Sequence, residues 1–349
     1  MSSESTHMVG VIGAGSFGTA VASLLAEKVP VMLYARRVEV IDRISKNRQH
    51  KGWELPENVK LTSSLSELAG ACELIFPIVP SEDFLVMIRE LSPFLKPNHK
   101  MIHGTKGLAV ELSDEEEFAT LERIEKSRVK TISELIREET VVRRIGCISG
   151  PNLASEIAQG QPAATVVASP YEEVIREGMA ALRHSRLRVH ASHDLLGIEL
   201  AGVLKNIMAI ASGIVSGLDY GDNTKALLIS RGLAEVVNVG KGLGADPRAF
   251  LGIAGVGDLV ATCYSKYSRN YTVGFRLAKG ESLEEIIADM EEVAEGVKTT
   301  AVVHALAQTY GISAPITAVV HRILFKNLET SRGVNLLMEY PFTEDVEFI

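Results

Sequence analysis

Cysteine is scarce in this sequence. The three cysteines among 349 residues, Cys72, Cys147 and Cys263, are scattered and lack the spacing of metal ligands. An odd few cysteines in a long chain suit a reducing cytoplasm, in which disulfides rarely form. We therefore interpret all three as structural residues. No cluster of histidine, cysteine and carboxylate residues has ligand spacing, so we expect no metal site.

Basic residues are not in excess either. The 36 lysines and arginines are outnumbered by 44 aspartates and glutamates, which gives a formal net charge of −8 at pH 7. A nucleic-acid-binding surface would be expected to carry a basic stripe. The charge balance therefore argues against a nucleic-acid partner, but it is compatible with a local basic pocket.

The sequence also lacks targeting and membrane signals. We expect no apolar run long enough to span a bilayer. The first residues, MSSESTHMV, have neither the basic start nor the apolar core of a secretory signal. Hydrophobic residues make up 46% and charged residues 23% of the chain, as in ordinary globular proteins. We therefore expect a cytoplasmic protein without stable membrane insertion.

The first half of the chain has the pattern of an α/β fold. Short apolar runs alternate with helical stretches, and several runs are too continuously apolar for a sheet with one solvated face. This pattern predicts a doubly wound sheet of parallel strands covered on both sides. The predicted strands lie at residues 8–13, 29–35, 71–79, 100–105, 143–149 and 164–169.

After about residue 192 the predicted strands cease and long helical stretches follow, at residues 194–217, 223–244 and 299–310. Because 349 residues are many for one hydrophobic core, we predict two domains, with boundaries 1–191 and 192–349. No low-complexity linker separates them. We therefore expect close packing with a ligand-binding cleft between them.

A charged segment at residues 112–140 stands apart from this pattern. Its apolar residues have a spacing that suits a surface helix with a solvated charged face. They are Phe118, Leu121, Ile124, Val129, Ile132, Leu135 and Ile136. We predict a surface helix here and assign it no chemistry.

The run VGVIGAGSFGTA places three glycines directly after a predicted strand and before a helix. Gly13 would permit a tight turn, Gly15 would let the backbone approach a pyrophosphate, and Gly18 would allow close packing of helix on strand. The helix N-terminus would supply N–H groups to the phosphates. This context favours dinucleotide binding over a simple flexible turn.

The second predicted strand ends in YARR. An NAD-binding site usually has an acidic residue here for the ribose 2′-hydroxyl. Arg36 and Arg37 would instead suit a 2′-phosphate, but a pair of solvated surface arginines explains the sequence equally well. The two interpretations stay open.

Polar residues follow two later strands of the predicted sheet. Lys106 comes after the strand at 100–105, and Gly150 and Asn152 open a helix after the strand at 143–149. Open α/β sheets bind ligands at the carboxyl ends of their strands. The alternatives are an ordinary loop lysine and a helix-capping asparagine.

The helical half contains further candidates. Asp258 lies among glycines and apolar residues, and Ser268, Arg269 and Asn270 follow in succession. An arginine fork with hydroxyl and amide donors suits a small phosphate dianion, although these three residues also look like a helix start. Glu295, next to a glycine, carries no assignment by itself.

Lys205 lies inside the apolar stretch ELAGVLKNIMAI. Reduction of a ketone creates an alkoxide that needs a proton from a nearby donor. Desolvation and a second cation such as Lys106 would lower the pKa of Lys205 toward a useful range, and Asn206 and Asp258 could orient it. The alternative is a lysine that reaches solvent or satisfies a buried carboxylate.

Taken together, these motifs resemble a known family. The order and spacing are those of the soluble NAD(P)-dependent glycerol-3-phosphate dehydrogenases of the bacterial type, over nearly the whole chain. The motifs are GAGSFGTA, TKGL, ISGPNLASE, LKNIMAI, ISRGLAE, GVGDLVATC and SRN. The resemblance implies a Rossmann-type domain over residues 1–191, an all-helical substrate domain over 192–349, and reversible reduction of dihydroxyacetone phosphate to sn-glycerol 3-phosphate.

The resemblance also implies roles for individual residues. The position of Lys205 matches the catalytic acid/base, with Lys106 and Asp258 beside it. Implied substrate contacts are Lys106, Gly150, Asn152, Lys205, Asp258, Ser268, Arg269 and Asn270. Implied cofactor contacts, together with the glycines of the turn, are Gly13, Gly15, Ser16, Phe17, Gly18, Arg36, Arg37, Lys106, Ala154, Arg269, Val293 and Glu295. The implied cofactors are NADP and NAD, the product would supply the backbone of phospholipids, and the implied assembly is a homodimer.

The sequence departs from the family pattern at three places. Phe17 replaces a more usual tryptophan or tyrosine, Asn152 replaces a more usual serine or threonine, and the segment 112–140 is longer than usual. Two other functions remain as alternatives. A β-hydroxyacid dehydrogenase of the same architecture would need a carboxylate site, and a nucleotide-sensing protein would have lost catalysis.

Overall fold

The computed structural model describes residues 8–113, 115–290 and 294–341. The chain divides into two compact units. Met1–Thr105 and Ile132–Leu195 form the first, here called the sheet unit, and Lys106–Thr131 and Leu196–Ile349 form the second, here called the helical unit. The predicted boundary at 191/192 thus differs from the structural one by a few residues, and the segment 106–131 belongs to the helical unit instead of the first domain.

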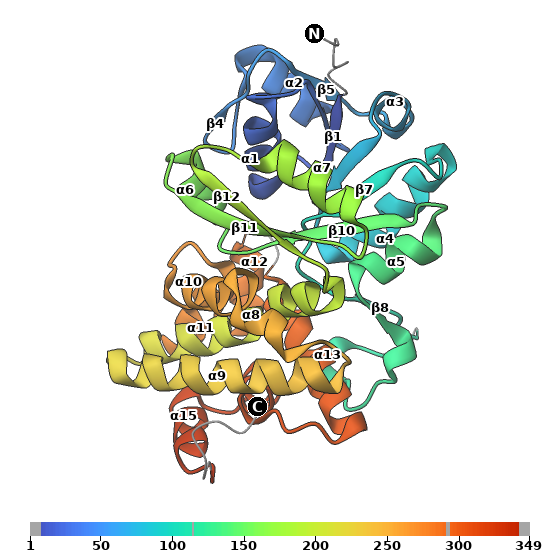
Figure 1. The fold of residues 1–349 in the computed structure, drawn as a ribbon. Coiled ribbons are helices and arrows are strands. Elements are labelled where there is room, and N and C mark those ends of the chain that lie inside the picture. The colour runs from blue at the N-terminus through green and yellow to red at the C-terminus, as the bar shows by residue number, and fades with distance from the viewer. Residues whose placement is uncertain (1–7, 114, 291–293, 342–349) are drawn as a thin grey trace. The chain divides into compact units, whose positions relative to one another are not determined.

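The sheet unit is built on eight strands in the order β12-β11-β10-β7-β6-β1-β2-β5 (Figure 1). All neighbours are parallel except β10 and β11, which run antiparallel. The strands are β1 (Val9–Ile12), β2 (Val31–Tyr34), β5 (Val59–Thr62), β6 (Leu74–Pro77), β7 (Lys100–His103), β10 (Arg144–Ser149), β11 (Ala163–Ala168) and β12 (Leu187–Ser192). The doubly wound sheet predicted from the sequence is confirmed, but it is mixed instead of wholly parallel.

All six predicted strands are present in the eight-stranded sheet, and the two further strands of that sheet were missed. β5 and β12 are the edge strands of the sheet, and each combines buried with exposed residues. An edge strand keeps contact with solvent, so it lacks the continuous apolar run that marks a central parallel strand. A separate short hairpin joins β3 (Gln49–His50) to β4 (Trp53–Glu54).

Helices of the sheet unit form two packed groups. α1 contacts α6 and α7, whereas α4 contacts α3 and α5. Because the strand order runs in opposite directions from β1, right-handed crossovers place these groups on opposite faces. The helices are α1 (Ser16–Ala26), α2 (Val38–Asn47), α3 (Leu65–Ala71), α4 (Ser81–Leu91), η1 (Ser92–Phe94), α5 (Ile132–Glu139), α6 (Ala154–Ala158) and α7 (Glu172–Leu182).

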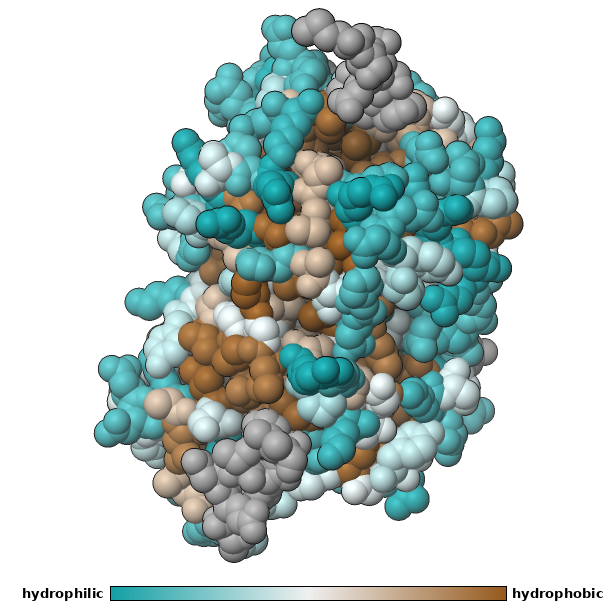
Figure 2. Space-filling view, viewed as in Figure 1, coloured by the Kyte–Doolittle hydropathy of each residue, from teal (hydrophilic) through white to brown (hydrophobic). Residues whose placement is uncertain are grey.

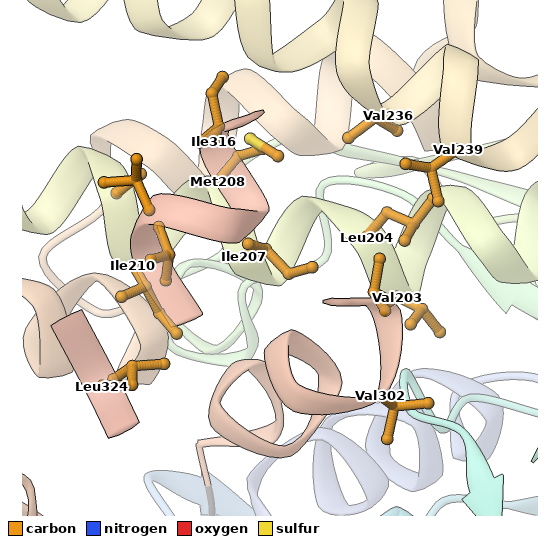
Figure 3. Close-up of a cluster of buried hydrophobic side chains, with 14 of the residues drawn as sticks. Val203, Leu204, Ile207, Met208, Ile210, Val236, Val239, Val302, Ile316 and Leu324 are labelled. Atoms are coloured by element: carbon orange, nitrogen blue, oxygen red, sulfur yellow. The ribbon is translucent and has the colours of Figure 1, made fainter. Parts of the chain in front are cut away.

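In the helical unit, α8 (Leu195–Gly217) lies in the hydrophobic core. Figure 3 shows its side chains Val203, Leu204 and Ile207 among residues from α9, α13 and α14. The other helices are α9 (Asp222–Gly242), η4 (Pro247–Leu251), η5 (Ile253–Gly257), α10 (Asp258–Tyr264), α11 (Arg269–Ala278), α12 (Leu283–Asp289), α13 (Glu295–Tyr310), α14 (Pro315–Phe325) and α15 (Thr330–Met338). The prediction that long helices follow residue 192 is confirmed.

By length and composition α8 is the one helix of the described residues that is long and apolar enough to cross a membrane, with a mean hydropathy of 1.6 over its most apolar window. The expectation that no apolar run is long enough to span a bilayer is therefore wrong for α8 by these two criteria, although Glu199 and Lys205 lie within the helix. The whole window is buried inside the protein. The apolar character of α8 is thus used in packing against its neighbouring helices.

The predicted surface helix over residues 112–140 is wrong as one continuous element and is confirmed only for α5, at its C-terminal end. β8 (Ala109–Val110) pairs with β9 (Val129–Lys130), η2 (Phe118–Thr120) and η3 (Lys126–Arg128) are single turns, and only α5 is a regular helix. Leu121, Ile124 and Val129 are buried in the core of the helical unit. These apolar residues therefore anchor separate turns in the core of the helical unit and do not form one face of a helix.

Candidate active site

The loop after β1 requires glycine at two positions. Gly13 has a φ of 113°, and a Cβ on it would overlap the carbonyl oxygen of Ile78. A Cβ on Gly18 would overlap the carbonyl oxygen of Gly13. These contacts close a tight turn and bring α1 against the sheet, as a dinucleotide-binding loop requires.

Gly15 has a different role. No atom lies within 4 Å of the position that its Cβ would take, and it is the N-cap of α1 without a side chain to bond the first turn. An open space at the N-terminus of an eleven-residue helix suits a pyrophosphate. Ser16 and Phe17 form the first turn of α1, and a Cβ at position 104 would lie 3.0 Å from the Phe17 ring. These residues fit a bound dinucleotide.

Arg36 and Arg37 follow β2 and are both exposed. Arg36 forms an ion pair with Asp83, with 3.2 Å between Nη1 and Oδ1, and its side chain is 65% exposed. Arg37 is the N-cap of α2. A guanidinium this exposed is available to a 2′-phosphate, but it must share its charge with the carboxylate of Asp83. The role of both arginines stays a prediction.

The chain after β10 is also shaped by a glycine. Gly150 has a φ of 149°, and a Cβ there would lie 2.9 Å from the carbonyl oxygen of Ala164. Asn152 donates from Nδ2 to Thr165 Oγ1 at 2.9 Å, while its buried Oδ1 has no hydrogen-bond partner among the described residues. Leu153, not Asn152, is the N-cap of α6, which begins at Ala154. Asn152 is therefore no helix cap, and its free acceptor remains available for a ligand.

A buried ionic cluster lies within the helical unit. Asp258 accepts from Lys205 Nζ at 2.6 Å through Oδ1 and from Lys106 Nζ at 2.7 Å through Oδ2. The side chains of Lys205 and Asp258 are only 7% and 3% exposed. The three residues predicted to form the catalytic group thus meet, although they lie far apart in the sequence.

Thr262 completes this cluster and was missed in the sequence analysis. Its Oγ1 accepts from Lys205 Nζ at 2.6 Å and lies 2.6 Å from the carbonyl oxygen of Asp258, to which it donates. Thr262 lies one helical turn after Asp258 on α10, so the two face the same side. That spacing was the available signal, but a threonine in an apolar helix is too common to be singled out.

Burial lowers the pKa of Lys205 to about 8, against the attraction of Asp258 and with the help of repulsion from Lys106. Burial by itself would raise the pKa of Asp258, but Lys106 and Lys205 outweigh it and hold that pKa below its ordinary value. Near neutral pH, Asp258 is therefore ionised. Lys205 has a pKa close enough to neutral pH to give up and take back a proton during catalysis.

A π-helical turn directly precedes Asp258 and positions it in the cluster. η5 precedes α10 directly, and a Cβ on Gly255 would overlap the backbone of Phe250 in η4. Single π-turns inside helical segments occur frequently at functional sites. Asp258 also stands in the first turn of α10, where the helix dipole stabilises a negative charge.

Two asparagines of the helical unit are held by backbone bonds: Asn206, which follows Lys205 on α8, and Asn270 on α11. Asn206 donates from Nδ2 to the carbonyl oxygen of Lys106 at 3.3 Å. The sequence analysis predicted that Asn206 would orient Lys205, but this bond is made to Lys106 instead. Asn270 accepts from the Gly296 N–H at 2.9 Å. A Cβ on Gly296 would lie 2.7 Å from Asn270 Oδ1. Glycine at 296 therefore allows the carboxamide of Asn270 to be fixed by the start of α13.

The remaining candidates lie at helix starts. Ser268 caps α11 by accepting from the Tyr271 N–H at 3.3 Å, and Arg269 is the exposed first residue of that helix. Glu295 is the first residue of α13. Val293 lies outside the described residues. The alternative that Ser268 and Arg269 form a helix start is correct, and it is compatible with phosphate binding at that N-terminus.

The cysteines contribute no chemistry. All three are buried, and burial raises the pKa of the Cys72 and Cys263 thiols to about 12. A thiol with so high a pKa is a poor nucleophile and a poor metal ligand. Within the described part of the chain, no group of three or more histidine, cysteine or carboxylate side chains is placed to hold a metal ion.

Together, the glycine loop on a doubly wound sheet and the buried lysine pair on Asp258 define a two-domain dehydrogenase that uses a nicotinamide dinucleotide. The sequence models of the NAD-dependent glycerol-3-phosphate dehydrogenase N-terminus and C-terminus match residues 8–175 and 194–335. The chain belongs to this family of NAD(P)-dependent oxidoreductases.

Individual proteins and structures that resemble this chain belong to the same family. The glycerol-3-phosphate dehydrogenase [NAD(P)+] of Pseudomonas fluorescens is 41% identical, over 98% of this chain and 93% of its own length. That of Staphylococcus epidermidis is 37% identical, over 94% and 97%. The crystal structure of glycerol-3-phosphate dehydrogenase from Coxiella burnetii is 33% identical, with a TM-score of 0.86 over 96% of this chain and 99% of that one.

Proposed function

We propose that the chain reversibly reduces dihydroxyacetone phosphate to sn-glycerol 3-phosphate with NADPH or NADH, and that Lys205 is the acid/base. Family membership supports the reaction. The observation that carries the role of Lys205 is its buried contact with Asp258, at 2.6 Å, beside the second cation Lys106. An inert structural lysine would pair with a carboxylate alone, whereas a second ammonium group destabilises the charge of the first and makes its proton easier to release.

The reduction needs a hydride and a proton. A nicotinamide cofactor, held at the loop of Gly13, Gly15 and Gly18, would supply the hydride. The ammonium of Lys205 gives its proton to the carbonyl oxygen and becomes a neutral amine, and in the reverse direction the amine takes the hydroxyl proton. Asp258 and Thr262 hold Nζ of Lys205 in one orientation. Lys106 keeps a positive charge nearby, which stabilises the negative charge that develops on the substrate oxygen.

The phosphate of the substrate requires fixed donors. The exposed guanidinium of Arg269, the Ser268 hydroxyl and the first turn of α11 are suited to a phosphate dianion. The Asn270 carboxamide is oriented by its bond to Gly296. Gly150 and Asn152 complete the proposed substrate contacts, with the unpartnered Oδ1 of Asn152 as an acceptor for a substrate hydroxyl.

We also propose a cytoplasmic homodimer that supplies glycerol phosphate for phospholipid synthesis. Figure 2 shows apolar side chains gathered on the surface of the helical unit. On α9 of the same unit, Leu227 is 44% exposed. Exposed apolar patches frequently mark association sites. Light scattering on the wild type and on Leu227→Asp tests the assembly: a monomeric wild type contradicts it, and a dimer that survives the substitution places the interface elsewhere.

The activity is tested by following NADPH and NADH oxidation with dihydroxyacetone phosphate and, in parallel, with oxo acids. Turnover with the phosphorylated ketone supports the proposal. Turnover with oxo acids alone would favour a β-hydroxyacid dehydrogenase, against which the family match argues. Cofactor binding without turnover of either substrate would favour a nucleotide-sensing protein.

A further inference from the structure

The segment Lys106–Thr131, here called the strap, leaves the sheet unit after Thr105 and is part of the helical unit. We propose that the strap is a device that positions Lys106, and that Lys126 of the strap and Tyr310 of α13, which are hydrogen-bonded to each other, are positioning residues for the reaction. This inference rests on the proposed function, because it needs Lys106 to act beside Lys205.

Lys106 is bound at both ends within the helical unit. Its ammonium bonds Asp258, and its carbonyl oxygen accepts from Asn206 at 3.3 Å. Lys106 is therefore held by the same helices as Lys205. This is so although only two residues separate Lys106 from the end of β7 in the sheet unit. Whatever holds the strap also fixes the distance between the two ammonium groups.

The base of the strap is closed three residues after Lys106. Ala109 and Val110 pair with Lys130 and Val129, and the Glu111 N–H donates to the Arg128 carbonyl at 2.9 Å. A ladder this short has little stability of its own. The strap therefore depends on contacts along the rest of its length.

Apolar residues supply the first set of these contacts. Leu108, Leu121, Ile124 and Val129 are buried in the same cluster as Leu204, the residue before the proposed acid/base. Strap and α8 thus share one core. A displacement of the strap would open a cavity in that core. Moving Lys106 away from its position would therefore cost free energy.

Hydrogen bonds supply the second set, and they gather at residues 124–126. The Lys126 N–H donates to Tyr310 Oη at 2.9 Å, and Tyr310 donates to Glu125 Oε2 at 2.9 Å. Lys126 Nζ donates to the Leu243 carbonyl after α9 at 2.6 Å. The Ile124 N–H donates to Thr309 Oγ1 at 3.0 Å. The ends of α9 and α13 therefore hold residues 124–126 of the strap.

The test uses the double variant Lys126→Met/Tyr310→Phe, which removes the bonds of the Lys126 ammonium and the Tyr310 hydroxyl and keeps the apolar stems. The bond from the Ile124 N–H to Thr309 remains in this variant. The control Lys279→Met/Tyr340→Phe removes the same groups from the helical unit outside the strap, where they bond Asp219 and Ser313. Hydrogen exchange of the strap amides measures how firmly the strap is held. Steady-state kinetics against pH measure the consequence for the reaction.

We expect strap amides to exchange about tenfold faster in the strap variant. Because Lys106 repels the charge of Lys205, a loosened Lys106 should raise the midpoint of the pH profile for glycerol phosphate oxidation, by about 0.3–1 pH unit. The KM for dihydroxyacetone phosphate should rise roughly three- to tenfold. The control should match the wild type, and restoring a donor with Lys126→Arg in the Tyr310→Phe background should recover part of the loss.

A purely structural strap would lower the amount of folded enzyme without moving the midpoint. Faster exchange with an unchanged midpoint and KM would overturn the positioning role. Unchanged exchange would overturn the assignment of Lys126 and Tyr310 as anchors. A wild type that fails to reduce dihydroxyacetone phosphate would instead refute the proposed function, so the two failures are distinguishable.

Discussion

The Nζ of Lys205 lies 2.6 Å from Oδ1 of Asp258, and both side chains are almost completely buried. A buried ion pair loses much hydration, and removing one partner leaves the other charge unpaired. Here Asp258 keeps a second partner in Lys106 if Lys205 is replaced. The cluster can therefore lose its proposed acid/base without leaving a carboxylate stranded.

Lys205→Met should accordingly fold and bind cofactor, but turn over at least about a hundredfold more slowly, because the developing alkoxide has no proton donor. Circular dichroism and cofactor titration check the fold, and steady-state rates check the loss. Lys279→Met, an exposed lysine on the helical unit, is the control. A Lys205→Met enzyme with the wild-type rate would make Lys205 a structural residue.

The pH dependence should have opposite signs in the two directions. Oxidation of glycerol phosphate requires the neutral amine of Lys205, so kcat should rise with pH and level off above a midpoint near 8. Reduction requires the ammonium form, so kcat should fall through the same midpoint. Rates measured between about pH 6 and 10 decide this, and parallel profiles in both directions would argue against a single acid/base.

The same argument predicts the effect of Asp258. Its negative charge raises the pKa of Lys205, so Asp258→Asn should move both midpoints to lower pH while the burial and Lys106 continue to lower that pKa. Asp289→Asn, an exposed carboxylate paired with Arg276, is the matched control and should move nothing. A midpoint that rises in Asp258→Asn would contradict the proposed electrostatics.

The sequence predicts the sheet unit well because its signals are local. Strands such as β1 are buried throughout, and Gly13 and Gly18 stand in the turn that directly follows it. The atom that excludes a Cβ on Gly13, however, is the carbonyl oxygen of Ile78, far along the chain after β6. The edge strands β5 and β12 escape the same reasoning, since partial exposure breaks their apolar runs.

The candidate site was harder to predict because its geometry is non-local. The family resemblance pointed to Lys106, Lys205 and Asp258. Nothing in the sequence spacing of these residues indicates, however, that both lysines bind the same carboxylate. The strap was predicted as a surface helix because Leu121 and Ile124 fit a helical spacing as well as they fit separate turns. Only contact with the core of the helical unit distinguishes the two.

Arg269→Ala should weaken binding of the phosphorylated substrate in particular, since a charge-assisted hydrogen bond to phosphate contributes roughly 1.5–3 kcal/mol. Unphosphorylated dihydroxyacetone should lose much less in kcat/KM. Lys266→Ala removes a neighbouring exposed cation and should affect both substrates little. Equal proportional losses for the two substrates in Arg269→Ala would place this guanidinium away from the phosphate.

The choice between NADPH and NADH should depend on Arg36 and its partner Asp83. No carboxylate follows β2 directly to bind a free 2′-hydroxyl, so we expect NADPH to be used at least as well as NADH, with a preference that weakens at high salt. Arg36→Ala should cost NADPH about 1–2 kcal/mol in kcat/KM and leave NADH nearly unchanged.

Asp83 gives a second, opposite test of the same site. Its carboxylate lies 3.2 Å from the Arg36 guanidinium and competes with a 2′-phosphate for it. Asp83→Asn should therefore lower the KM for NADPH and not that for NADH, and the gain should vanish when Arg36 is alanine, because the effect passes through that guanidinium. Steady-state kinetics of the two single variants and the double variant, with both cofactors at two ionic strengths, measure this coupling. An Arg36 variant that loses both cofactors alike, or an Asp83 effect that persists without Arg36, would make Arg36 an ordinary surface arginine.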